Sequence, residues 1–461
     1  MIAKQQRTGE HDSRFKPYQA YKDSGVEWLG EIPAHWEVKR LKYFVRVRAD
    51  KLFEKPENLP YLGLENIESW TGRILLENQP ESVDSTISMF KPGDVLFGKL
   101  RPYLAKAARI QFDGVCTTEL LVLQPSLDCD QNYLFYSMLS QEFIRWIDSS
   151  TYGTKMPRAS PEQVKNCGIG IPPLPEQQAI ADFLDRETAK IDVLVMKKEK
   201  LIELLQEKRA ALISHAVTKG LDTNVPMKDS GVEWLGEIPA HWEVKRLKTI
   251  ASVQLGNVDK KSVEGQEPVL LCNYVDVYYN EYITADLDFM PATATPEQIQ
   301  RFSLCAGDVL VTKDSETPDD IAVPAVVAED LPGVICGYHL AHIRPMPLAV
   351  EGRFLAREFA ALGPRDQFHA AANGITRFGL TGDVVCSAVF CLPPLPEQQA
   401  IANFLDRETA KIDALVAKIR EGIGLLKEYR TALISAAVTG KIDVRSNGES
   451  KHLQDQSVWR A

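Results

Sequence analysis

A near-exact internal duplication constrains the fold of this 461-residue chain more than any other feature. The segment KDSGVEWLGEIPAHWEVKRLK at residues 22–42 recurs unchanged at 228–248, and PPLPEQQAIADFLDRETAKID at 172–192 recurs at 393–413 with one substitution. The offsets are 206 and 221 residues, so the divergent segment between the blocks is longer by 15 residues in the second copy. A short-period array would need at least three repeats, so the chain is interpreted as one large unit present twice.

Each second block begins a long predicted helix. Pro175 and Pro396 suit the first helical turn, where proline is tolerated, and Gly220 and Gly440 indicate helix ends. Apolar residues then recur every seven positions over about four heptads, with Lys198 interrupting the first copy, which predicts a coiled coil. The predicted seam consists of Leu184, Ile191, Leu194, Leu201, Leu205, Leu212, Leu405, Ile412, Leu415, Ile419, Leu426 and Leu433.

An apolar stripe is also typical of an amphipathic helix that packs only on its own module. A helix from about residue 178 to 218 spans roughly 60 Å at 1.5 Å per residue, which is more than a small module covers. Two matched copies therefore favour packing of helix against helix. Gly422 and Gly424 in the second helix indicate a kink, a close approach or a weaker stretch.

The divergent segments mix short β-type runs bounded by Pro and Gly with helical stretches, which predicts α+β modules. Faint similarities persist between them, such as PGDVLF at 92–97 against AGDVLV at 306–311. The predicted organisation is an N-terminal tail at 1–21, a first variable domain at 22–170, a central helix at 171–222, a second variable domain at 223–391, a distal helix at 392–443 and a polar C-terminal tail at 444–461.

Composition is that of an ordinary globular protein, with 44% hydrophobic and 25% charged residues. There is no apolar run near the roughly 20 residues that a bilayer requires and no apolar signal core at the start, so we expect a cytoplasmic protein. The net charge of −10 argues against a uniformly basic coat for nucleic acid but leaves a local basic face open. Eight cysteines without a CxxC pair predict free buried thiols.

Motifs that would carry chemistry are present only in part. The segment from Gly93 to Lys99 matches a phosphate-binding loop except that Leu100 replaces the final Ser or Thr, and its interior reads as a buried strand. His339 and His342 lack a third nearby ligand, so a structural role is favoured over a metal site. The chain is therefore expected to be non-catalytic and to bind no cofactor. The repeated tryptophans suit core packing better than base stacking: Trp28, Trp36, Trp234 and Trp242.

The ordered set of a KDSGVEWLGEIP block, a divergent module and a PPLPEQQ entry to a long helix, all repeated over residues 22–443, resembles the specificity subunit of type I restriction-modification enzymes. The resemblance implies an α+β fold with two target-recognition domains separated by two long antiparallel helices, which form a coiled-coil spacer with a pseudo-two-fold internal repeat. Each domain would read one half of an asymmetric, bipartite site in double-stranded DNA. The helices and adjoining repeats would dock two methyltransferase subunits, and restriction subunits would complete the enzyme.

The same resemblance places the chemistry in the partners. Adenine methylation with S-adenosylmethionine, and DNA cleavage driven by ATP and magnesium, would belong to the methyltransferase and restriction subunits. Two unlike readers on a matched scaffold would explain why the modules diverge while their flanks do not, since different half-sites need different base contacts.

Candidate DNA-binding residues cluster after one strand of each module and in one loop that both modules share. A cation in this loop of both modules suggests phosphate positioning rather than base choice. The second module is poor in cations, so tight binding is expected only together with the methyltransferase subunits. The candidates are Lys99, Arg101, Tyr103, Thr154, Lys155, Arg158, Lys313, Thr376 and Arg377.

Two other classes of function stay open at this point. One is a protein assembly scaffold with no DNA readout, in which case substituting Lys155, Arg158 and Arg377 together would leave DNA binding unchanged. The other is a stand-alone enzyme, which would turn over substrate as the purified chain. The target bases and the length of the gap do not follow from the sequence.

Overall fold

The computed structural model describes residues 15–77, 80, 83, 85–153, 155–374 and 376–445. The chain divides into two compact units. The first unit contains the described residues up to Lys198 and those from Glu421 onward, and the second contains Glu199–Arg420. Both boundaries cut the long helices α4 (Leu174–Lys219) and α10 (Leu395–Val438), so each unit joins one variable module to parts of both helices. The compact units therefore differ from the linear order of domains predicted from the sequence.

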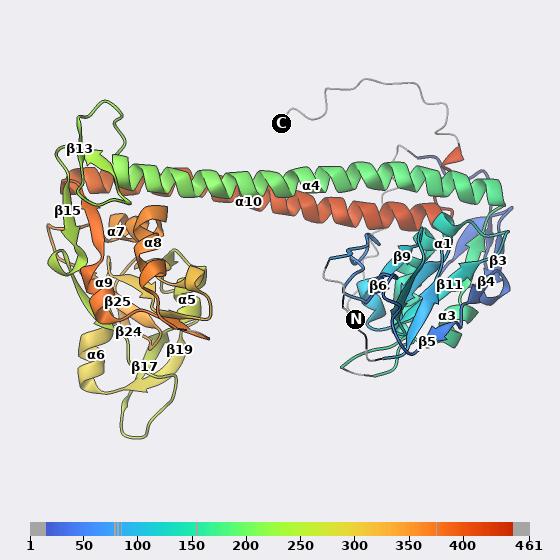
Figure 1. The fold of residues 1–461 in the computed structure, drawn as a ribbon, viewed down its shortest axis with the longest axis horizontal. Helices are drawn as coiled ribbons and strands as arrows, with labels where there is room; N and C mark the ends of the chain where they lie inside the picture. The colour runs from blue at the N-terminus through green and yellow to red at the C-terminus, as the bar shows by residue number, and fades with distance from the viewer. Residues whose placement is uncertain are drawn as a thin grey trace, which may run out of the picture. The chain divides into compact units, whose positions relative to one another are not determined.

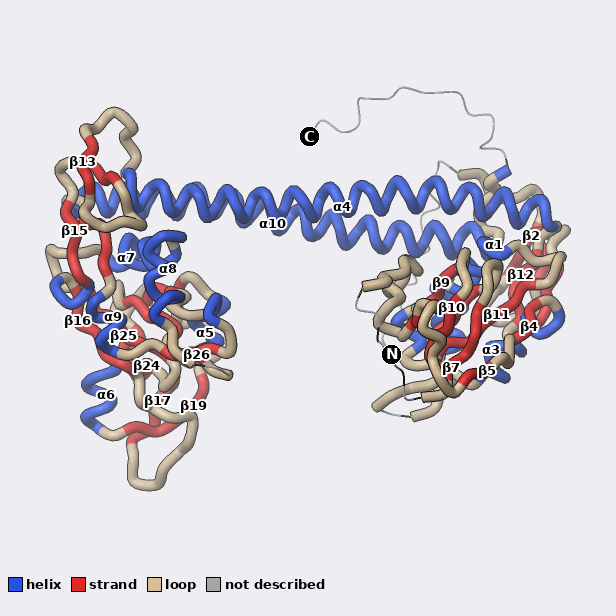
Figure 2. The backbone as a smooth tube through the Cα atoms, viewed as in Figure 1, coloured by secondary structure: helices blue, strands red, loops and turns tan. Residues whose placement is uncertain are grey.

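The first unit holds the first module, residues 43–170, as short strands and short helices joined by loops (Figure 2). Its sheets have the orders β1-β2, β5-β7-β10-β6, β4-β11-β8-β9 and β12-β3. Its elements are β1 (Tyr21–Asp23), β2 (Glu31–Pro33), β3 (Glu37–Arg40), η1 (Leu41–Tyr43), β4 (Val45–Val47), β5 (Lys51–Leu52), β6 (Tyr61–Leu62), β7 (Ile87–Phe90), β8 (Val95–Gly98), η2 (Pro102–Leu104), β9 (Ala107–Arg109), β10 (Gly114–Thr117), β11 (Leu120–Pro125), α1 (Gln131–Met138), α2 (Gln141–Ser149), α3 (Pro161–Asn166) and β12 (Gly168–Ile171).

The second unit holds the second module, residues 249–392, in the same style. Its sheets have the orders β13-β14, β15-β27, β16-β25-β21-β23-β18, β19-β17-β24-β20 and β22-β26. Its elements are β13 (Met227–Asp229), β14 (Glu237–Pro239), β15 (Glu243–Arg246), η3 (Leu247–Thr249), β16 (Ala251–Leu255), β17 (Glu267–Cys272), α5 (Tyr274–Tyr279), β18 (Tyr282–Ile283), β19 (Met290–Ala294), α6 (Pro296–Phe302), β20 (Ser303–Leu304), β21 (Val309–Thr312), β22 (Asp314–Ser315), η4 (Pro318–Asp320), β23 (Pro324–Val327), β24 (Leu331–Cys336), β25 (Leu340–Pro345), α7 (Gly352–Ala360), α8 (Leu362–Ala371), β26 (Phe378–Gly379), α9 (Gly382–Ser387) and β27 (Val389–Leu392).

A fully buried strand divides each module into two cores. In β8, Val95 and Phe97 point into the larger core with the helices, whereas Leu96 points into a smaller core between the sheets. In β21, Val309 faces the larger core and Leu310 the smaller one. Successive side chains of a strand alternate between faces, so continuous apolar runs of this kind require a sheet covered on both sides. The phosphate-loop look-alike at residues 93–99 is thus a buried strand, as predicted.

The repeated blocks form the same joint in each unit. Strand β3 pairs antiparallel with β12, and β15 pairs in the same way with β27. At the start of each long helix a glutamine side chain ties the helix to its module: Gln177 accepts from the backbone N–H of Asp130, and Gln398 accepts from that of Glu351. The identity of the blocks is explained by this shared joint.

The long helices lie side by side and run in opposite directions within each unit (Figure 1). In the first unit Arg430 of α10 pairs with Asp192 of α4 at 2.9 Å. In the second unit the ion pair is reversed, because Arg209 of α4 pairs with Asp413 of α10 at 3.0 Å. The two arginines are 221 positions apart, as are the two aspartates, so the same interhelical contact occurs once in each unit with the roles of the helices exchanged. This agrees with the predicted α+β fold with antiparallel long helices.

Helix ends follow the same symmetry. Gly220 and Gly440 both adopt positive φ, as the predicted helix stops require. A Cβ at Gly220 would lie 3.3 Å from Trp242, and one at Gly440 would lie 2.3 Å from Pro33. Each helix therefore ends against the repeated block of the other copy. Helix α10 continues without a break through Gly422, where an added Cβ would lie at an ordinary contact distance of 3.5 Å from the ammonium of Lys198.

Burial along the helices corrects the predicted seam. The register of Leu184, Ile191, Leu205 and Leu212 in α4 and of Leu405, Ile412, Ile419, Leu426 and Leu433 in α10 is buried or half-buried. Leu194 is half-buried, but Leu201 and Leu415 are 43% and 45% exposed. The second seam position lies four residues after the first, as Val195, Ile202 and Val416, and not three residues after it. Residues three and four positions apart lie on the same helix face. The leucines three positions after the first seam residue therefore led to the wrong prediction of the second seam position.

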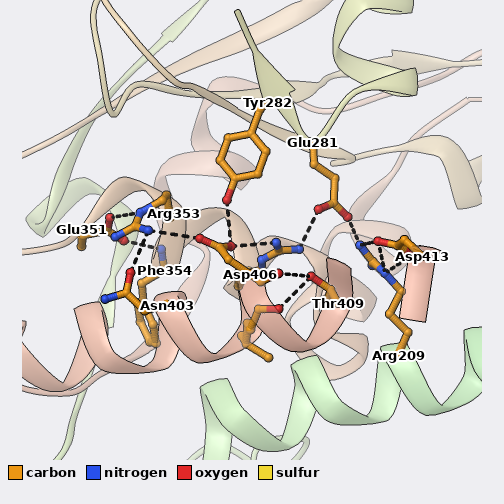
Figure 3. Close-up of polar contacts among 12 residues, drawn as sticks. Arg209, Glu281, Tyr282, Glu351, Arg353, Phe354, Asn403, Asp406, Thr409 and Asp413 are labelled. Carbon is orange, nitrogen blue, oxygen red and sulfur yellow. Dashed lines mark hydrogen bonds and ion pairs between the residues drawn. The ribbon is translucent and has the colours of Figure 1, made fainter. Parts of the chain in front are cut away.

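A carboxylate at one repeated position anchors each module to its long helix. Asp406 of α10 accepts hydrogen bonds from Tyr282 at 2.7 Å and Arg357 at 2.9 Å and pairs with Arg353 at 3.1 Å (Figure 3). In the first unit the matching aspartate uses different partners, Arg109 at 2.7 Å and the Tyr136 hydroxyl at 2.6 Å on Asp185. The anchor position is shared, whereas the groups that reach it belong to each module.

Both predicted tails are shorter than expected. Tyr18 is buried, and its hydroxyl donates to Glu176 at 2.8 Å, so residues 15–21 belong to the first unit and not to a tail. At the other end Val444 is buried in the same core, and Asp443 pairs with Lys16 in a β-bridge. Aromatic and ion-pair contacts of single residues fix these segments, and such contacts leave no periodic pattern in the sequence.

Predictions about single residue types are mostly confirmed. All eight cysteines are free, and all are buried except Cys386, which is half-buried, and Cys305, which is exposed. Trp36 and Trp242 lie in the cores, and Trp28 packs on Trp146. Trp234 is 39% exposed, contrary to the core prediction, and its ring lies against the backbone of Gly363. No helix among the described residues is long and apolar enough to cross a membrane.

Candidate nucleic-acid interface

The first candidate cluster forms where β8 ends. The backbone of Lys99 receives a hydrogen bond from Ala159 at 2.9 Å and donates one to Glu119 at 2.9 Å, and Arg101 donates to the carbonyl of Pro157 at 2.7 Å. The fold therefore brings the segment after β8 together with the loop at residues 152–158. Arg101 adopts a left-handed conformation with φ 51°, which turns the chain into η2 and leaves its side chain exposed.

The side chains of this cluster are cations and aromatic groups, of which Lys99 is half-buried and the others are exposed. Within the described part of the chain, Lys99, Arg101 and Lys155 have no ion-pair or hydrogen-bond partner for their side chains. Arg158 is different, because Glu119 holds its guanidinium through two contacts at 3.0 and 3.2 Å. Exposed aromatic and thioether groups lie in the same segments: Tyr103, Tyr152 and Met156. Thr154, which the sequence also placed in this site, lies outside the described residues.

Two neighbouring cations have structural roles. Lys106 donates its ammonium protons to the carbonyls of Leu64 and Ile67 at 2.6 and 2.9 Å, and Arg109 anchors Asp185 on α4. Proximity in sequence to Lys99 therefore does not place a cation in the interface.

The second candidate cluster occupies the same place in the second module. The backbone of Lys313 donates to His339 at 2.9 Å and accepts from Leu380 at 2.8 Å, so it matches Lys99. Its ammonium, however, is buried, pairs with Asp314 at 2.5 Å and lies 4.7 Å from the ring centre of Tyr338. Lys313 is thus a support for its neighbours and not an exposed phosphate contact, contrary to the expectation from the sequence.

A chain of polar contacts leads from this lysine to the loop. Asp314 also pairs with Nδ1 of His339 at 3.0 Å, and Nη2 of Arg377 lies 3.2 Å from Nε2 of that imidazole. Burial alone would raise the pKa of Asp314, but hydrogen bonds from Lys313 and His339 outweigh it and lower that pKa. The carboxylate therefore stays charged and holds the imidazole beneath Arg377. Thr376 is exposed beside it.

The two histidines of the sequence motif face different carboxylates. His342 is buried and pairs with Asp308 at 2.8 Å, whereas His339 pairs with Asp314. Arg344 also binds Asp308, at 2.7 Å. Among the described residues no group of three or more His, Cys, Asp or Glu side chains could hold a metal ion.

Backbone hydrogen bonds align the shared loop position by position. Tyr152 and Arg158 exchange two of them at 3.2 and 3.0 Å, and Asn373 and Gly379 do the same at 3.3 and 3.0 Å. Each loop is followed by a capping Ser or Thr and a short helix, α3 or α9. Both loops therefore have seven residues, and the offset between them is 221 throughout.

This alignment corrects the match made from sequence. Thr376 corresponds to Lys155, and Arg377 corresponds to Met156, so the cation does not occur at the same position of both loops. The sequence match placed Lys155 opposite Arg377, which shifts one loop by one residue relative to the backbone alignment. The inference that a shared cation positions phosphate loses its basis. Sequence reasoning also missed Met156 and Tyr338, which are 54% and 50% exposed, because a lone exposed apolar residue carries no motif.

Comparison with known proteins gives consistent results across the chain. A family model described as "Type I restriction modification DNA specificity domain" matches residues 33–204. The chain is 28% identical over 203 residues to the type I restriction enzyme EcoDI specificity subunit of Escherichia coli, covering 42% of this chain and 44% of that protein. It is 23% identical over 454 residues to the type I restriction enzyme MjaVIII specificity subunit of Methanocaldococcus jannaschii, covering 93% of this chain and 98% of that one.

Solved structures share the fold. One, from work on complex assembly and conformational transition of the type I R-M system, has a TM-score of 0.68 at 19% identity and covers 89% of this chain and 99% of its own. The HsdS subunit of Thermoanaerobacter tengcongensis has a TM-score of 0.50 at 19% identity, with 89% and 98% covered. Together with the duplicated blocks and the paired long helices, these comparisons show that the chain is similar in sequence and in fold to type I restriction-modification specificity subunits.

Proposed function

We propose that this chain reads a bipartite, asymmetric site in double-stranded DNA, with one half-site for each module. The observation that carries the proposal is that two loops of equal length and equal backbone hydrogen bonding present different side chains on a matched scaffold. Sequence is read by base-edge contacts, so readers of different half-sites need the same frame with different side chains. The exposed cations Arg101 and Lys155, with the half-buried Lys99, supply the positive charge that phosphates require.

We propose further that the long helices and repeated blocks dock two methyltransferase subunits and that restriction subunits join this complex. Members of this family are non-catalytic subunits of type I complexes. S-adenosylmethionine, ATP and magnesium would accordingly be used by the partners. The blocks occur twice and nearly unchanged, which suits two copies of one partner.

The direct test is the salt dependence of DNA binding by the chain assembled with its methyltransferase subunits. Lys99→Ala, Arg101→Ala and Lys155→Ala together should weaken binding to every sequence and lower the salt slope by roughly 2 to 3. Lys91→Ala is the matched control, because Lys91 is exposed at the opposite end of β8 from Lys99. Unchanged binding and slope in the triple variant would favour a protein scaffold without DNA readout.

A further inference from the structure

The shared loop at residues 152–158 and 373–379 places Met156 of the first module and Arg377 of the second at equivalent positions. Gly153 and Gly374 adopt positive φ, and an added Cβ would lie 3.2 Å from the carbonyl oxygen of Met156 and 1.9 Å from that of Arg377. In both loops the backbone of this residue therefore closes over the glycine. The paired backbone hydrogen bonds at the loop ends give Met156 and Arg377 the same backbone surroundings in their two loops.

The residue presented there differs in chemistry between the modules. Met156 is more than half exposed, although burying its side chain would be favourable by about 2 kcal/mol. Arg377 is exposed, and within the described residues it has no carboxylate partner, its polar contact being His339. Some arginines of the modules are held by acids, as Arg158 is by Glu119 and Arg344 by Asp308, whereas in the described part of the chain Arg377 shares the lack of a carboxylate partner with Arg101.

A phosphate contact does not fit this difference. Phosphates are the same at every sequence, so a position that binds them would keep a cation in both modules. A position that changes from thioether to guanidinium is one that changes with the half-site. Arginine with a free fork is the group that most often reads guanine, through O6 and N7, and an apolar side chain suits the methyl group of thymine.

We propose that this loop position reads a base in each half-site, with Arg377 binding the O6 and N7 edge of a guanine and Met156 contacting the methyl group of a thymine. The proposal rests on the proposed function. Lys313 pairs with Asp314, Asp314 pairs with His339, and His339 contacts Arg377. These three are therefore positioning residues for Arg377. Thr376 and Lys155 remain beside the reading position.

The experiment uses the full chain assembled with its methyltransferase subunits. Methylation mapping defines the bipartite site, and equilibrium binding is measured on duplexes with each base pair of one half-site replaced in turn. Arg377→Lys keeps the charge but loses the fork, and Arg377→Met introduces the group of the first loop. Both should lower discrimination at one G·C pair by about 5- to 150-fold and leave the other half-site unchanged.

A role in phosphate binding gives a different outcome. Arg377→Lys would then retain the discrimination of the wild type, and Arg377→Met would weaken all duplexes equally and lower the salt slope by about 1, which overturns the proposal. Met156→Arg is the reciprocal variant and should change preference at one position of the other half-site only. Unchanged thermal unfolding midpoints of these exposed-loop variants show that the modules remain folded.

The failure of this proposal is distinguishable from failure of the proposed function. A wild-type complex without any sequence preference would overturn both. A wild-type complex with a bipartite site whose Arg377 variants keep full discrimination would overturn the base-reading assignment alone.

Discussion

The two modules share the same backbone joints and loop hydrogen bonds but differ in the side chains that stand at equivalent positions. Position for position, Ser137 in α1 matches Glu358 in α7, and Met156 in one loop matches Arg377 in the other. The joints to the long helices and the hydrogen bonds that close the loops are shared. The comparison teaches that the fold separates residues that hold a module from residues that face its ligand, so each class can be changed without the other.

The largest expected effect concerns the helix seam, where the two units are most alike. Ile191→Asp should lower the free energy of unfolding by about 4 kcal/mol, because it buries an uncompensated charge. Ile412→Asp, at the same repeated position but only half-buried, should cost less. Denaturant unfolding of both variants measures the difference. Leu415→Asp is the control and should cost less than about 0.5 kcal/mol, and an equal loss there would restore the seam register predicted from the sequence.

The anchoring carboxylates should show the next largest difference. Asp406→Asn removes one of the two carboxylate partners of the buried Arg357, the other being Glu281 at 3.0 Å, and should cost about 2 kcal/mol of unfolding free energy. Asp185→Asn should cost about 1 kcal/mol, because both members of its ion pair are about a third exposed to solvent. Chemical denaturation followed by tryptophan fluorescence compares them. Equal losses would mean that the two anchors are energetically alike despite their different partners.

The buried glutamate of the second module should make its stability depend on pH. Glu358 is fully buried in α7, and its carboxyl oxygens have no hydrogen-bond partner among the described residues. Burial raises its pKa well above the ordinary 4.5, with the backbone of Cys391 compensating only in part. The folded state therefore keeps a proton that the unfolded chain releases, and stability is lost as pH rises from about 4.5 toward the folded pKa.

Glu358→Gln should consequently raise the free energy of unfolding at pH 7 by about 1 to 2 kcal/mol, and the gain should shrink as the pH is lowered toward 5. Urea unfolding between pH 5 and 8 measures this trend. The first module has a serine at the matching position, so its unfolding should lack this contribution. A gain that is the same at every pH would show that Glu358 is not protonated in the folded state.

The smallest expected effect is on DNA binding, when the residue that positions Arg377 is replaced. His339→Phe keeps a flat ring but removes the contacts with Asp314 and Arg377 and should reduce discrimination at the Arg377 base pair by about 5-fold. Binding to duplexes altered in the other half-site should not change. Competition binding with single-base variants measures both quantities, and a loss spread over both half-sites would contradict a local role.

Features carried by many residues could be predicted from the sequence, and features carried by a few contacts could not. The duplication, the two long helices, their ends at Gly220 and Gly440 and the buried strand before Lys99 all follow from identity or periodicity. The exposure of Leu415 could not be predicted, because positions three and four apart share a helix face. The burial of Lys313 depends on Asp314 and Tyr338, and the alignment of Arg377 with Met156 depends on backbone hydrogen bonds, which leave no mark in side-chain sequence.

The central claim is that each module reads one half-site on a shared frame. It is tested most directly by replacing residues 43–170 with the module of another specificity subunit and mapping methylated bases after coexpression with the methyltransferase subunits. The account predicts that one half of the methylated motif changes while the other half and the gap stay the same. A change in both halves, or in neither, would contradict it.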